Sequence, residues 1–149
     1  MPSLPLRTLR VYCGSRSTSG LFVYVRVFGT RGAMLKTISL EHGTVGNRGF
    51  GRGVDGVMET RRTIRVHKGG GRRMLPCIGT VNLFRGGLTD EIVTHEFAHA
   101  MFAYGERKRW MEKGSLGRPI MAIEELYCYA LGRMVARFWR RARVLGLLG

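Results

Sequence analysis

The chain has 149 residues, of which 44% are hydrophobic, and a formal net charge of +15 at pH 7. This length fits one domain, residues 1–149, with enough apolar residues for a core. There is no run of 18 or more apolar residues, and the N-terminus lacks the apolar stretch of a signal peptide. These features exclude a transmembrane helix and favour a cytoplasmic protein.

The cysteines Cys13, Cys77 and Cys128 are far apart and odd in number, and no C-x-x-C pair occurs. A disulfide framework or a zinc site built from cysteines is therefore not expected. We expect reduced and mostly buried thiols.

The positive charge comes mainly from arginine, because only four of the 25 basic residues are lysines. A chain of this charge is attracted to polyanions such as nucleic acids, acidic proteins and anionic membranes. The basic residues are spread along the sequence, which is also typical of a solvated arginine-rich surface. Charge alone therefore leaves two interpretations open, a dedicated polyanion contact and a surface without one.

Strand patterns dominate the first half of the chain. Residues 21–28 are rich in β-branched and aromatic side chains, which favours a strand. Thr30 is placed to cap a helix that ends near Gly43. Further strands are predicted at residues 62–67 and, most clearly, at residues 78–84.

Glycine-rich segments separate these elements. Residues 45–56 hold five glycines and are predicted to be a loop, and residues 69–71 are predicted to be a turn. Residues 51–56 match G-x-G-x-x-G, but no strand closely precedes the motif and no clear helix follows it. A dinucleotide site is therefore not expected there.

Helical patterns dominate the second half. Thr89 can cap a helix whose first turn holds two acidic residues, which suit the positive end of the helix dipole. Gly105 is predicted to end this helix, and residues 106–118 to form a loop. A last helix is predicted over residues 120–145. The chain therefore belongs to the α+β class.

The segment His95-Glu96-Phe97-Ala98-His99 reads H-E-x-x-H within the first of these helices. Residues i and i+4 share one face of a helix, so both imidazoles can bind one metal ion. Glu96 is then placed to accept a proton from a water molecule. This combination is typical of a zinc hydrolase.

A catalytic zinc site usually has three protein ligands and one open position. No histidine follows His99, so a carboxylate is the expected third ligand. Glu124 and Glu125 lie together in the last helix, and their side chains point about 100° apart, so one of them is expected to bind zinc. Glu125 is favoured, because the small residues Cys128 and Gly132 on its face would allow a close approach to the motif helix. Glu124 is the alternative.

H-E-F-A-H followed by E-E-L-Y-C-Y-A-L-G resembles the gluzincin branch of the zincin metallopeptidases. The closest likeness is to minimal zincin-like proteins of bacteria and phages, including the ImmA/IrrE-type peptidases, and it covers roughly residues 78–135. The resemblance implies Zn²⁺ bound by His95, His99 and Glu125, with Glu96 as the catalytic base. It also implies a bacterial cell or a phage-infected host cell as the setting.

The resemblance further implies a minimal zincin fold. In that fold a small, mostly antiparallel sheet accompanies the active-site helix, and a C-terminal helix carries the third ligand. An edge strand just before the metal helix pairs with extended substrate, and residues 78–84 match its position. The expected function is hydrolysis of a peptide or protein substrate, for which the charge favours an acidic one. The alternative is a basic protein associated with nucleic acid, in which zinc is structural or non-catalytic.

Overall fold

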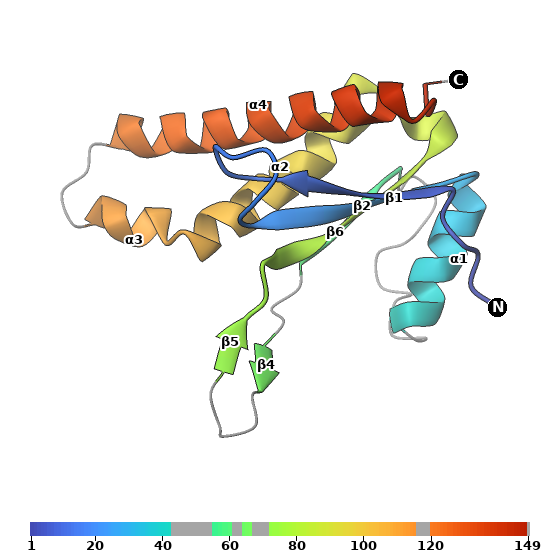
Figure 1. Cartoon of the computed structure of the whole chain (residues 1–149), viewed down its shortest axis with the longest axis horizontal. Helices are drawn as coiled ribbons and strands as arrows, with labels where there is room; N and C mark the ends of the chain where they lie inside the picture. The colour runs from blue at the N-terminus through green and yellow to red at the C-terminus, as the bar shows by residue number, and fades with distance from the viewer. Residues whose placement is uncertain (43–54, 61–63, 67–71, 116–119, 149) are drawn as a thin grey trace.

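The computed structural model describes residues 1–42, 55–60, 64–66, 72–115 and 120–148 (Figure 1). The strands are β1 (Arg7–Tyr12), β2 (Phe22–Phe28), β3 (Val57–Thr60), β4 (Ile64–Val66), β5 (Arg72–Met74) and β6 (Cys77–Phe84). The helices are α1 (Arg31–His42), α2 (Asp90–Arg107), α3 (Trp110–Ser115) and α4 (Ile120–Val144), with a 3₁₀ turn, η2, at Arg85–Gly87. The α+β prediction is confirmed.

A four-stranded sheet has the order β1-β2-β6-β3. The β1–β2 and β3–β6 pairs are antiparallel, whereas β2 and β6 run parallel. The sheet is therefore mixed, because the chain leaves β2 and returns to pair with it only after α1 and three further strands. Strands β4 and β5 form a separate antiparallel hairpin that projects from the sheet (Figure 1).

The prediction that residues 78–84 form an edge strand is wrong. Strand β6 lies between β2 and β3, and six of its eight residues are buried. Its nearly continuous apolar run is typical of a strand with neighbours on both sides. The edge strand on this side of the sheet is β3, which pairs with β6. It has four residues, and the sequence patterns did not predict it.

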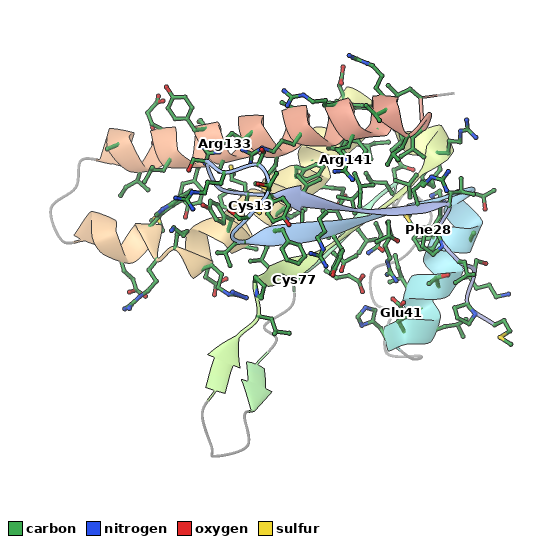
Figure 2. The ribbon with its side chains drawn as sticks, viewed as in Figure 1. Cys13, Phe28, Glu41, Cys77, Arg133 and Arg141 are labelled. Atoms are coloured by element: carbon green, nitrogen blue, oxygen red, sulfur yellow. The ribbon has the colours of Figure 1, made fainter. Side chains whose placement is uncertain are left out.

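The main core lies between the sheet and the helix pair α2 and α4, which cover one face (Figure 1). Alternate residues of β2 point into this core and are fully buried, as are Phe97 of α2 and Phe138 of α4. On the other face, Phe28 of β2, labelled in Figure 2, forms a second buried cluster with Met34 and Ile38 of α1. In the described part of the chain, no helix is long and apolar enough to cross a membrane.

Two predicted helix starts are confirmed. The Oγ1 atom of Thr30 accepts a hydrogen bond from the Ala33 backbone N–H at 3.1 Å. The Oγ1 atom of Thr89 accepts one from the Ile92 N–H at 3.3 Å. Each cap supplies a partner for a backbone donor that the helix itself leaves free.

The predicted end of the motif helix is wrong. Helix α2 continues through Gly105 to Arg107, and the stretch predicted to be a loop contains α3. Gly105 instead allows α4 to pack closely on α2, because the ring of Tyr127 from α4 lies directly against the Gly105 backbone. A side chain at position 105 would collide with that ring.

The last helix is confirmed as α4, and its apolar side packs into the main core. Two of its arginines do not simply face water. Arg137 donates to the carbonyl oxygens of Tyr12 and Gly14 at 2.7 and 2.5 Å. Arg133 donates to that of Cys13 at 3.4 Å, and both of these residues are labelled in Figure 2. These bonds fix the loop that joins β1 to β2.

Several sequence predictions fall wholly or partly on undescribed residues. The glycine-rich loop lies outside the described residues except for its last two positions, and the turn at residues 69–71 lies outside entirely. The strand predicted at residues 62–67 is described only over β4.

Candidate metal centre

His95 and His99 lie side by side on α2, one turn apart. Their Nε2 atoms are 3.3 Å apart, their ring planes are nearly perpendicular, and both residues are exposed. Zinc–nitrogen bonds of about 2.0–2.1 Å at a tetrahedral angle place two ligand nitrogens roughly 3.3 Å apart. The pair therefore fits two ligands of one zinc ion. A hydrogen bond between two neutral imidazole rings has a similar length.

Glu96 differs from the two histidines in its surroundings, because only 5% of its surface is exposed. Burial raises the pKa of its carboxyl group, while the electrostatic interaction with His95 and a hydrogen bond from the Met58 backbone N–H lower it in part. Gly56, the residue before β3, lies against the side chain. A Cβ atom there would stand 2.6 Å from Glu96 Cγ and 3.0 Å from Glu96 Oε1.

These groups open into one pocket with a volume of about 480 Å³. One wall is α2, with His95, Glu96 and His99. The other wall is the edge strand, with Met58 and Thr60. The volume lies in the range of roughly 300–1,000 Å³ that is typical of ligand sites. The sheet edge and the H-E-x-x-H face of the helix thus form a single cleft.

Glu125 is not among the residues that line this pocket. It is exposed near the start of α4, as is Glu124. Among the described residues, no group of three potential metal ligands with ligand atoms within 4.8 Å of one another includes His95 or His99. The assignment of Glu125 as the third ligand stays a prediction.

The packing argument that favoured Glu125 is wrong. Cys128 and Tyr129 are exposed, and a Cβ atom at Gly132 would meet nothing within 4 Å. Helix α4 approaches α2 through Tyr127 instead. On a helix, Tyr127 shares a face with Glu124, three residues earlier, and not with Glu125. The packing therefore turns the Glu124 side of α4 toward the motif helix.

The sequence interpretation also missed Glu106, which lines the same pocket. It lies eleven residues after His95 and seven after His99, which is close to three and two helical turns. The three side chains therefore share one face of α2. Helical spacing was the signal that could have found Glu106, but the predicted helix end at Gly105 placed it in a loop.

A second group of potential ligands, Glu41, His42 and Glu59, lies on the opposite face of the sheet, and its ligand atoms are within 4.8 Å of one another. It could hold a metal ion, but Arg26 already supplies a cation. Arg26 bonds both oxygens of Glu41 at 2.6 and 2.8 Å and one oxygen of Glu59 at 3.2 Å. The other oxygen of Glu59 contacts His42, and Asn82 donates to the carboxylate at 2.7 Å. Arg26 thus already pairs with both carboxylates of the group.

Comparisons with known protein families, with curated proteins and with solved structures give no match to this chain.

Proposed function

We propose that the chain is a zinc-dependent metallopeptidase that hydrolyses peptide bonds, with Zn²⁺ held by His95, His99 and a third ligand from a carboxylate. The observation that carries the proposal is the 3.3 Å separation of the two Nε2 atoms beside a buried glutamate, in a pocket large enough for a substrate. The sequence prediction for the third ligand is Glu125, and Glu124 is the alternative.

Zinc, when bound, would supply a Lewis acid that polarises a carbonyl group and brings the pKa of a water ligand close to neutrality. Glu96 is the general base: its carboxylate takes a proton from the attacking water and then delivers it to the leaving amine. Contact with Gly56 restricts where the carboxylate can move. Burial raises its pKa, which makes the carboxylate a stronger base than an exposed glutamate.

The edge strand supports a peptide as the substrate. Strand β3 pairs with β6 on one side, and within the described sheet no strand pairs with its other side. Its residues Met58 and Thr60 line the pocket that holds the histidines. An extended peptide can bind such an edge through backbone hydrogen bonds, and this would carry its carbonyl groups past Glu96.

Glu96→Gln tests the proposal, because it removes the base and keeps the size of the side chain. The measurements are zinc content after dialysis and cleavage of an unstructured protein such as casein. We expect one zinc per chain in both forms and a loss of hydrolysis of at least about 100-fold, the lower range for a general base. Glu91→Gln makes the same chemical change at an exposed position of α2 and is expected to retain the full rate.

Two results would contradict the proposal. Zinc-free wild-type protein that does not take up zinc would show that the histidine pair is only hydrogen-bonded. Zinc binding with equal hydrolysis by the wild type and Glu96→Gln would leave the metal without a catalytic role.

A further inference from the structure

The face of the sheet opposite the main core carries a group of aromatic rings at the end away from α1. Tyr12, Phe22 and Tyr24 form a row in which neighbouring rings meet edge to face, with centroids 5.6 and 5.1 Å apart. Phe22, in the middle of the row, is buried, whereas the two tyrosines are half-buried. Helix α1 lies below the other end of the sheet (Figure 1). The rings of Tyr12 and Tyr24 therefore offer partly open apolar surfaces.

Arg10 on β1 completes this group. Its guanidinium carbon lies 4.8 Å from the ring centre of Phe22 and 5.5 Å from that of Tyr24. Hydrogen bonds to the side chains of Tyr12 and Tyr24 raise the pKa of Arg10. The guanidinium is thus an exposed, flat cation that neighbouring rings already hold in place. Less conformational entropy is lost when such a group binds an anion.

A small hollow adjoins these side chains. Its volume is about 160 Å³, and it is lined by Thr8, Tyr24, Arg26 and Thr80. A cavity of about 150 Å³ can hold a benzene ring, so one planar ring fits here. The two threonine hydroxyls can donate or accept hydrogen bonds, which suits a ring with polar edges better than a purely apolar one.

The charge of this part of the chain is entirely positive. The first forty residues contain no Asp or Glu, but they contain five arginines and one lysine. Arg7, Arg10 and Arg16 are exposed on β1 and in the loop that follows it. The acidic groups of the Arg26 network lie on α1 (Glu41) and on β3 (Glu59), where Glu59 is in register with Thr80, and both carboxylates are paired with Arg26. A polyanion would meet no like charge along β1.

We propose that the Arg10 face, defined as Thr8, Arg10, Tyr12, Phe22 and Tyr24, binds single-stranded nucleic acid. Bases stack on the two tyrosines and on the guanidinium plane, and exposed arginines contact the phosphates. Single strands are favoured over duplexes because the open rings need unpaired bases. This surface lies across the sheet from the α2–α4 core, and it does not depend on the proposed peptidase activity.

The test is the fluorescence anisotropy of a labelled oligothymidine of roughly 20 nucleotides, with the full chain and its variants. Arg10→Gln and Tyr24→Leu are each expected to weaken binding about tenfold. Arg143→Gln is the matched control, because it removes one exposed positive charge from α4, on the other side of the sheet. It is expected to change the affinity less than about twofold.

Three further measurements separate stacking from charge. Tyr24→Leu leaves the net charge unchanged, and Tyr24→Phe, which keeps the ring, is expected to bind nearly as the wild type does. Heparin, a polyanion without bases, and duplex DNA are expected to compete at least about tenfold less well than the single strand. Glu96→Gln is expected to bind the oligonucleotide normally, which separates this proposal from the metallopeptidase.

The proposal is overturned if the wild type does not bind the oligonucleotide. It is also overturned if Arg10→Gln and Arg143→Gln lower the affinity for the oligonucleotide equally. It is also overturned if heparin or duplex DNA competes as well as the single strand. Circular dichroism checks the fold of each variant. If Tyr24→Leu does not fold, the comparison of Arg10→Gln with Arg143→Gln still decides.

Discussion

Gly56 lies directly against the side chain of Glu96, so the backbone just before β3 limits where this carboxylate can go. A Cβ atom at position 56 would stand 2.6 Å from Glu96 Cγ, far inside normal contact. Glycine is needed here for close approach and not for an unusual backbone conformation, since Gly56 is not among the described residues with positive φ. The segment that leads into the edge strand is thus in direct contact with the H-E-x-x-H motif.

This contact predicts that Gly56→Ala displaces Glu96. A displacement of about 1 Å at a catalytic group can lower the rate roughly 100-fold. We therefore expect a fall in peptide hydrolysis of about 10- to 100-fold with unchanged zinc content, because the three atoms nearest to the added Cβ all belong to Glu96. The measurements are the rate of casein cleavage and bound zinc.

Gly132→Ala is the control for this substitution. Gly132 lies in α4, where an added Cβ atom would meet nothing within 4 Å. Activity should be unchanged, and the free energy of unfolding should rise by about 0.5–1 kcal/mol, because alanine favours the helix interior more than glycine does. Full hydrolysis by Gly56→Ala would show that Glu96 is not constrained by this contact.

A second prediction concerns the third ligand of the proposed zinc site. We expect Glu124→Ala to lower zinc affinity more than Glu125→Ala, because Glu124 shares a helix face with Tyr127, which packs on α2. The expected loss is at least about tenfold, measured by competition with a chromogenic chelator. A larger effect of Glu125→Ala would support the prediction from the sequence resemblance instead. If neither variant changes the affinity, Glu106→Ala is the decisive variant, since Glu106 lines the pocket.

A third prediction concerns the cysteines, all three of which are free thiols. Burial raises the pKa of Cys13 to about 12, whereas Cys128 is exposed on α4. Alkylation requires the thiolate. At pH 8 iodoacetamide should therefore modify Cys128 and spare Cys13, as read by peptide mass mapping. Rapid modification of Cys13 in folded protein would contradict its burial.

The same shift has a consequence for stability. The unfolded chain loses the Cys13 proton near pH 8.5, whereas the folded chain keeps it until about pH 12. The folded state therefore binds more protons between these values. The contribution of this thiol to the free energy of unfolding is complete below pH 8.5 and falls as the pH rises. Denaturant titrations of wild type and Cys13→Ala at pH 7 and pH 10 would measure this contribution. Between these two pH values the free energy of unfolding is expected to fall less for the variant than for the wild type.

The sequence by itself determined the features that depend on neighbours along the chain. Helical periodicity placed His95 and His99 on one face, and the hydroxyl groups of Thr30 and Thr89 marked where two helices begin. The apolar run of β6 predicted a strand. Each of these follows from backbone geometry within a few residues, so it can be inferred without knowing where the rest of the chain lies.

The tertiary structure alone decided which distant segments meet. Strand β3 is short and half-buried, and it becomes an edge only by pairing with β6, so its position beside Glu96 could not be inferred from its own residues. Gly105, which local rules place at a helix end, instead accommodates Tyr127. That contact sets which side of α4 faces the motif helix. Strand order and helix packing depend on burial between segments far apart in sequence, and local patterns do not encode that burial.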